Sequence, residues 1–139
     1  TYRNQVTKPF PFVGQLLERL RDAGLTLGLV TAGNRDRVHR ELDDFELGEF
    51  FAAVVCCEDT EEKKPHPAPL TRALEHLDVA PQATVYVGDR PEDIVMGQKV
   101  GAYTVGVESE YGSRPVLEEA EPDLILPHAG HLVDSFRRD

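Results

Sequence analysis

Short apolar segments with strand character alternate with amphipathic helical segments along most of this 139-residue chain, and this alternation constrains its fold most. The pattern predicts strands at 25–31, 50–57, 83–88, 102–108 and 122–127. Parallel strands that are separated by helices are joined by right-handed crossovers. We therefore predict one α/β domain, 1–139, in which helices cover both faces of a mostly parallel sheet.

Helical periodicity fills the intervals between the predicted strands. Val13, Leu16, Leu17 and Leu20 share one face of the first predicted helix, and Gly24 follows as its C-terminal cap. Val38 and Leu42 point inward from the second. The predicted helices span 11–23, 35–43, 67–77, 91–100 and 129–137.

Charge and composition exclude several classes of partner. The formal net charge is −10, and so acidic a surface repels nucleic acids and anionic membranes. No apolar run approaches the roughly 20 residues of a membrane span. A small phosphorylated substrate stays compatible with this charge, because local cationic groups can override the global sign.

Cysteine usage favours the cytoplasm. Cys56 and Cys57 are the two cysteines of the chain, and adjacent cysteines rarely form a good disulfide. Two cysteines are also too few for a structural zinc site. The first ten residues lack the continuous apolar region of a secretory signal. We expect reduced, mostly structural thiols in a cytoplasmic protein.

The strand predicted at 25–31 ends in a group of residues suited to an anion. Thr31 ends the strand, and Ala32, Gly33 and Asn34 lead into the next helix. A hydroxyl with backbone N–H groups at a helix start can bind phosphate. The alternative is that Thr31 or Asn34 only caps the helix.

A lysine follows the second predicted strand in the sequence EKKPHPAP. Lys64 precedes Pro65, which favours an extended backbone, and Pro67 can start the next helix. An ammonium held at such a place could neutralise a phosphoryl oxygen and a carboxylate together. The alternative is a solvated lysine in a charged loop.

Two carboxylates follow the strand predicted at 83–88. Asp89 comes directly after the strand, and Asp93 lies about one helical turn later, so both can face the same side of the junction. Oxygen ligands of this kind suit Mg²⁺, which binds few protein carboxylates. The alternative is a capping box in which Asp89 caps the helix, Pro91 starts it and Glu92 reaches back.

The order of these three stretches resembles the haloacid dehalogenase-like hydrolases, within their phosphoglycolate phosphatase-like branch. LLERLRDAGLTLGLVTAGN resembles the second motif of that family, KKPHPAP its lysine motif and VYVGDRPEDIVMGQKVGAYTVGV its acidic motif. The resemblance covers about residues 8–137. It implies a three-layer, Rossmann-like parallel sheet.

The resemblance also implies Mg²⁺-dependent hydrolysis of a phosphomonoester through an aspartyl-phosphate. Thr31 and the nearby backbone N–H groups would bind the phosphoryl oxygens, and Lys64 would offset charge there. Asp89 would bind Mg²⁺, directly or through water, and Asp93 would support it.

One part of the family pattern is absent from this sequence. The family's Asp-x-Asp motif follows its first strand and supplies the nucleophile and the general acid, but no Asp precedes Asp22 and no Asp-x-Asp occurs here. Residues 1–12 resemble the return from the family's cap. The resemblance thus implies a C-terminal part, without first strand, nucleophile and most of the cap.

In the family, that first strand lies between the strands that end in the threonine and in the acidic motif. Each backbone group left unpaired in a core costs about 1–3 kcal/mol, against a total stability of ~5–15 kcal/mol. We therefore expect the strand to come from an N-terminal segment, a partner chain or a second copy. Direct pairing of 27–31 with 84–88 is the alternative.

Two rival functions follow from the same residues. A catalytically silent domain could keep the phosphate or Mg²⁺ site as a binding or regulatory module. A receiver domain has a similar sheet and a lysine, but its acidic pocket comes first in the chain, whereas here it comes last.

His128 and His131 could share a helical face, yet no acidic or cysteine partner is close in sequence. For His66 we expect a surface position.

Overall fold

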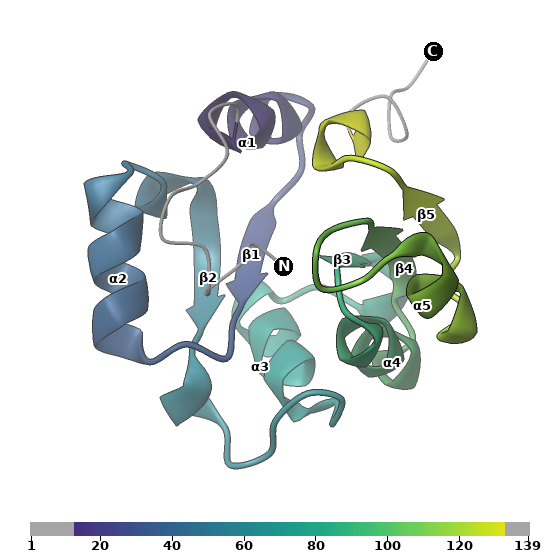
Figure 1. The fold of residues 1–139 in the computed structure, drawn as a ribbon. Helices are drawn as coiled ribbons and strands as arrows, with labels where there is room; N and C mark the ends of the chain where they lie inside the picture. The colour runs from purple at the N-terminus through teal and green to yellow at the C-terminus, as the bar shows by residue number, and fades with distance from the viewer. Residues whose placement is uncertain (1–12, 133–139) are drawn as a thin grey trace.

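The computed structural model describes residues 13–132 and is drawn as a ribbon in Figure 1. The interpretation of residues 1–12 as a return from a cap lies outside the described residues. So does most of the helix predicted at 129–137, of which the structure describes a 3₁₀ turn, η4 (Ala129–His131).

The strands form two parallel sheets. The first contains β1 (Leu27–Val30) and β2 (Phe51–Val55), and the second contains β3 (Val85–Gly88), β4 (Tyr103–Val107) and β5 (Leu124–Leu126) in that order. All pairs are parallel, which confirms the predicted α/β class. Each strand lies within its predicted range and is shorter at both ends, except that β3 ends at its predicted residue, Gly88.

The two sheets replace the single sheet that the pattern of strands suggests. Within residues 13–132, β1 pairs only with β2, and β3 pairs only with β4. The structure therefore shows no direct pairing of β1 with β3. The side-chain pattern cannot reveal such a gap, because a strand has the same periodicity whether one or both of its edges are paired.

Helices flank both sheets (Figure 1). The predicted helices are confirmed as α1 (Val13–Asp22), α2 (Arg35–Asp44), α3 (Ala68–Leu77) and α4 (Pro91–Val100). Gly24 follows α1 with φ of 90°, a left-handed conformation that glycine adopts without strain. Short 3₁₀ turns, η1 (Gly48–Phe50), η2 (Cys57–Asp59) and η3 (Pro81–Ala83), complete the connections.

One helix is missing from the sequence-based prediction. Helix α5 (Arg114–Glu119) has six residues, and Leu117 is its one buried residue. A single apolar contact in six residues makes no periodic pattern, so the hydrophobicity of the sequence gives no signal for this helix.

A shared core joins the two sheets on the side of α3 and α4. Val30 and Val55 of the first sheet and Tyr86 of the second pack in one buried cluster with Leu74 and Met96. A second cluster, which includes Val38 and Leu42, packs α2 against the other side of the first sheet. No helix within residues 13–132 combines the length and the apolar character that crossing a membrane requires.

Candidate functional site at the carboxyl ends of the strands

Lys64 joins the ends of β1 and β3. Its Nζ lies 2.8 Å from Oδ1 of Asp93 and 3.4 Å from the carbonyl oxygen of Val30, the last residue of β1. Asp93 lies in the first turn of α4, which follows β3. The Lys64 side chain is 15% exposed and that of Asp93 only 1%. The structure therefore holds this lysine between two strand ends and does not leave it solvated.

Asp93 also caps helix α4. The backbone N–H of Arg90, the N-cap, donates to Oδ2 of Asp93 at 3.3 Å, and Pro91 begins the helix. The alternative of a capping box formed by Asp89 and Glu92 is thus wrong: the N-cap is Arg90, and Asp93 is the third helical residue. The cap begins one residue later because β3 ends in Gly88 and Asp89 lies outside the helix.

Gly88 brings the acidic turn close to the strand. A Cβ on Gly88 would lie 2.2 Å from Cβ of Asp93 and 2.6 Å from its Oδ2. No side chain larger than hydrogen fits there unless Asp93 moves. The Gly-Asp-x-x-x-Asp spacing therefore has a steric cause in addition to a chemical one.

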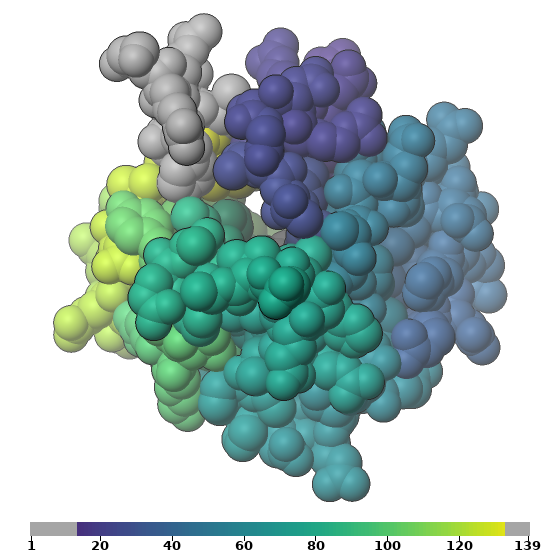
Figure 2. Space-filling model, turned by 180° about the vertical axis from the view of Figure 1, so that it is seen from behind, coloured from purple at the N-terminus to yellow at the C-terminus, as the bar shows by residue number. Residues whose placement is uncertain are grey.

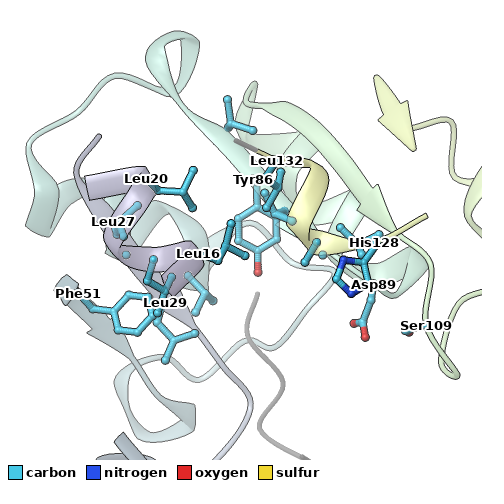
Figure 3. A pocket seen from close by; sticks show the side chains of 18 of the residues that line it. Leu16, Leu20, Leu27, Leu29, Phe51, Tyr86, Asp89, Ser109, His128 and Leu132 are labelled. Carbon is cyan, nitrogen blue, oxygen red and sulfur yellow. The ribbon is translucent and has the colours of Figure 1, made fainter. Parts of the chain in front are cut away.

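Asp89 is buried, at 5% exposure, and lines a cavity between β1 and β3 (Figure 3). The loop after β4 rests on its backbone, because a Cβ on Gly112 would lie 2.2 Å from the carbonyl oxygen of Asp89. Next to it, the guanidinium of Arg90 stacks over the ring of Tyr111 at 4.4 Å. The loop after β4 thus packs against both the backbone of Asp89 and the side chain of Arg90.

Thr31 is buried at the end of β1, and its Oγ1 accepts a hydrogen bond from the N–H of Gly33 at 3.1 Å. Asn34 caps α2, since its side chain accepts from the N–H of Arg37 at 2.9 Å. The cap interpretation is therefore confirmed for Asn34 and not for Thr31. Ala32 is exposed at the turn between them.

The carboxylate of Glu58, in η2, accepts a hydrogen bond from the first N–H of α2. The sequence-based prediction did not include this contact. Glu58 accepts from the N–H of Arg35 at 2.9 Å, and the Arg35 side chain pairs with Asp59. Hydrogen bonds from its own N–H and from that of Arg35 lower the pKa of Glu58. Burial pushes the pKa of Asp59 up, but the N–H of Cys56 and the Arg35 guanidinium outweigh it and lower the pKa. No local pattern could pair residues 23 or 24 positions apart.

The two cysteines lie at the end of β2 as free thiols, as expected. Burial, as the largest cause, raises the pKa of Cys56 and also that of Cys57. Both thiols therefore stay protonated near neutral pH, which fits a structural role.

The histidines take structural positions. His66 is exposed, as expected, and its Nδ1 accepts from the N–H of Ala68 where α3 begins, at 3.0 Å. His128 caps η4 through the N–H of Gly130 and meets the ring of His131 edge to face. Among the described residues, no group of three or more His, Cys, Asp or Glu side chains could hold a metal ion.

Mg²⁺ nevertheless needs fewer protein ligands than such a group contains. It binds through one or two carboxylates, keeps several waters and takes the rest of its ligands from phosphate. Asp89 and Asp93 are buried carboxylates on one strand–helix junction, so this donor set fits Mg²⁺. Both carboxylates lie at the carboxyl ends of parallel strands, which is where open α/β sheets bind ligands. The fold and the site thus define the class as an α/β protein with a candidate ligand site at the strand ends.

Comparison with known proteins makes the class specific. Residues 1–107 match the model of the haloacid dehalogenase-like hydrolases. The chain belongs to this family, and the resemblance seen in its motifs is confirmed.

Two bacterial relatives named pyrophosphatase PpaX are similar over most of the chain. The protein from Bacillus mycoides is 36% identical over 99% of this chain, and the one from Bacillus cereus (strain G9842) is 36% identical over 95%. The chain spans 64% and 61% of these two proteins, respectively.

Solved structures share the fold. A predicted phosphoglycolate phosphatase from Haemophilus somnus superposes with a TM-score of 0.86 and 25% identity, over 94% of this chain and 58% of that one. A predicted phosphatase from Clostridium acetobutylicum gives 0.83 at 23% identity, over 92% and 59% of the two chains.

Proposed function

We propose that this chain is the phosphate- and Mg²⁺-binding core of a phosphomonoester hydrolase. The observation that carries the proposal is the ion pair between Lys64 and the buried Asp93, in which the Lys64 ammonium also reaches the end of β1. A cation held between two strand ends, beside a second buried carboxylate, suits a phosphoryl group with a divalent metal.

Each residue has a proposed role. The hydroxyl of Thr31 donates to a phosphoryl oxygen, because its oxygen already accepts from Gly33. The exposed turn at Ala32 and Asn34 lets the phosphate approach Thr31 and the backbone of Gly33. Lys64 neutralises charge on the phosphoryl oxygens in the transition state.

Asp89 and Asp93 would hold the metal. Asp89 would bind Mg²⁺ directly or through water, and Asp93 would support it while keeping Lys64 in place. When bound, Mg²⁺ would stabilise negative charge on the equatorial oxygens of the phosphoryl group.

Hydrolysis through an aspartyl-phosphate also needs a nucleophile, and we propose that it comes from outside these 139 residues. No Asp-x-Asp occurs in the sequence, and Asp89 and Asp93 already serve the metal in this proposal. The relatives named pyrophosphatases favour testing inorganic pyrophosphate as a substrate beside small phosphate esters.

Binding measurements on the purified chain test the site without the nucleophile. We expect Asp89→Asn to weaken Mg²⁺ binding at least about tenfold in calorimetry, because one charged ligand is lost. Lys64→Gln should weaken binding of inorganic phosphate in the presence of Mg²⁺. The controls are Asp44→Asn and Lys99→Gln, which change charge at the C-terminal ends of α2 and α4, away from the site. Equal effects of control and site variants would contradict the proposal.

The second candidate is a silent module that binds phosphate or Mg²⁺ without hydrolysing it, favoured by the absence of Asp-x-Asp. An aryl phosphate assay with Mg²⁺ separates the two on a longer form that includes the preceding segment of the gene product. Turnover there supports the enzyme, and binding without turnover supports the module. Turnover by residues 1–139 alone, lost in Asp89→Asn, would contradict the external nucleophile.

We also propose a cytoplasmic location, without nucleic acid or membrane as partner. The support is the pair of free, protonated thiols and the net charge of −10. Fractionation of cells that express the natural protein tests the location.

A further inference from the structure

Asp89 belongs to neither a strand nor a helix. β3 ends at Gly88, and Arg90 is the N-cap of α4, so Asp89 lies in the short connection between the two elements. The proposed function nevertheless sets strict demands on its position, because Mg²⁺ accepts oxygen ligands only in a nearly ideal octahedral arrangement. What packs against this connection therefore bears on how well Asp89 can serve a metal.

The turn after β4 packs directly against this connection. We call residues 109–112 the β4 turn. Gly112 is buried, and a Cβ added to it would lie 2.2 Å from the carbonyl oxygen of Asp89 and 3.2 Å from its carbonyl carbon. Cβ atoms essentially never come within 3.0 Å of another heavy atom, so only glycine lets the two backbones approach this closely.

Hydrogen bonds within the β4 turn fix its conformation. The N–H of Ser109 donates to the carbonyl oxygen of Gly112 at 3.1 Å, and the N–H of Gly112 donates back at 3.3 Å. The two residues thus form a single antiparallel bridge. The hydroxyl of Ser109 also accepts from the N–H of Tyr111 at 3.0 Å. The turn is therefore closed on itself before it meets Asp89.

Helix α5 supports the β4 turn from the other side. Leu117 is fully buried, and a Cβ on Gly112 would lie 3.1 Å from its Cδ2, while one on Gly106 of β4 would lie 3.4 Å from its Cδ1. Arg114 pairs with Glu108, just before the turn, at 3.1 Å, but so exposed an ion pair contributes little stability. The turn therefore cannot recede from Asp89 without disturbing the buried Leu117.

Tyr111 of the β4 turn contacts the residue that follows Asp89. The guanidinium of Arg90 lies 4.4 Å from the centroid of the Tyr111 ring, within the range of cation–π attraction. The Nε of Arg90 is buried and has no hydrogen-bond partner among residues 13–132. Because Tyr111 is itself 38% exposed, its ring adds little to the core and instead covers the guanidinium.

The β4 turn also borders the cavity that Asp89 lines. Asp89, Ser109 and Tyr111 all belong to its wall, and Figure 3 labels the first two. From behind, a hollow is visible between the purple and the teal and green parts of the molecule (Figure 2). The turn thus shares a cavity wall with Asp89 as well as contacting its backbone.

We infer that the β4 turn positions Asp89 for the metal, an inference that rests on the proposed role of Asp89 as a Mg²⁺ ligand. Gly112 sets where the Asp89 backbone lies, and the Tyr111 ring holds Arg90 and with it the peptide that follows Asp89. Neither residue touches the metal, so both are positioning residues that act through Asp89. Changes to groups that orient a metal ligand typically cost about 10- to 100-fold in metal affinity.

Mg²⁺ titrations of the purified chain, followed by NMR at the amides of Gly88 and Arg90, test this role. Gly112→Ala adds a Cβ that must displace the backbone of Asp89. We expect this variant to bind Mg²⁺ at least about tenfold more weakly than the parent. Asp89→Asn is the reference for loss of the ligand itself.

Variants of Tyr111 give a second test that does not crowd the backbone. Tyr111→Leu removes the aromatic ring but keeps an apolar side chain, and should weaken Mg²⁺ binding about two- to tenfold. Tyr111→Phe keeps the ring and should bind Mg²⁺ as the parent does. Tyr103→Leu makes the matched change at a tyrosine of β4 that is 44% exposed and outside the cavity wall, and should leave binding unchanged.

A further control separates positioning from a general loss of stability. Leu42→Ala removes a buried side chain from the cluster that packs α2 against the first sheet, whereas the β4 turn follows a strand of the second. This variant should unfold at a lower urea concentration and still bind Mg²⁺ as the parent does. Circular dichroism shows whether each variant is folded, and the Tyr111 variants decide the question if Gly112→Ala is not.

The possible results distinguish this inference from the proposed function. If Asp89→Asn weakens Mg²⁺ binding while Gly112→Ala and Tyr111→Leu do not, the positioning role is wrong and the proposed function stands. If Asp89→Asn leaves binding unchanged, the proposed metal role fails and the positioning role with it. Equal weakening by Leu42→Ala, or by Tyr111→Phe and Tyr111→Leu alike, would also overturn the inference.

Discussion

At the scale of single residues, one carboxylate performs two tasks that the sequence presents as alternatives. Oδ2 of Asp93 accepts the N–H of Arg90 and so caps α4, while Oδ1 pairs with Lys64. A helix cap and a polar site are therefore not exclusive here. The arrangement requires that Asp93 lie close against the strand, and Gly88 permits this.

Gly88→Ala tests this close approach. The new Cβ would lie 2.2 Å from Cβ of Asp93, so either the strand or the helix start must shift. We expect a loss of about 1–3 kcal/mol in the free energy of unfolding, as for other overpacked positions. Urea denaturation measures it.

The matched control is Gly14→Ala in α1, where an added Cβ meets nothing within 4 Å. Alanine favours a helix over glycine by roughly 0.5–1 kcal/mol, so this variant should be as stable as the parent or more so. Similar destabilisation by both variants would contradict the steric role of Gly88.

At the scale of elements, α2 is tied to η2 by charge. Glu58 binds the first N–H of the helix, and Arg35 returns from the helix to Asp59. The carboxylate also interacts favourably with the helix dipole. Two segments that are distant in the sequence are thus fixed together at the ends of β1 and β2.

This network predicts how stability depends on pH. The pKa values of Glu58 and Asp59 are lowered in the folded state from the ordinary 4.5 and 3.8. Their contribution is therefore fully present above about pH 4.5 and is lost as the pH falls through the lower, folded values. Asp59→Asn should reduce the loss of thermal stability between pH 6 and pH 3, measured by circular dichroism.

Glu75→Gln on α3 removes a carboxylate outside the network and serves as the control. It should show the same dependence on pH as the parent. If Asp59→Asn and Glu75→Gln behave alike, the network does not contribute in the way that its geometry implies.

At the scale of the whole molecule, the two sheets share one buried core. Met96 is fully buried in the cluster that joins Val55 of one sheet with Tyr86 of the other. Because β1 and β3 do not pair, the side chains of α3 and α4 supply the connection between the sheets.

Met96→Ala tests this connection. Loss of a buried methionine side chain should cost about 2–5 kcal/mol, measured by urea denaturation. If the core couples the sheets, hydrogen exchange should accelerate in both β2 and β4. Acceleration in β4 alone would show that the sheets open independently, and the exposed control Val116→Ala should change stability by less than about 0.5 kcal/mol.

The helices and strands of this protein could be predicted from the sequence far better than the pairing of the strands or the contacts between distant side chains. The helix predicted at about 91–100 agrees with α4, and Pro91 at its start and Gly101 after its end explain why its bounds are easy to place. The short α5 could not be, since Leu117 alone carries its burial. Of the candidate site, the spacing of Asp89 and Asp93 indicated a shared junction, whereas the alternative of a helix cap at Asp89 is wrong.

The sequence by itself determined the alternation of strands and helices, and the polar residues that end each strand. These features are local, because hydrophobic periodicity and turn residues act within a few positions. Only the tertiary structure decided that Lys64 meets Asp93, that Glu58 accepts from the first N–H of α2, and that β1 and β3 do not pair. Contacts between distant segments depend on how the chain packs in three dimensions, and one strand's side-chain pattern does not say which backbone edge finds a partner.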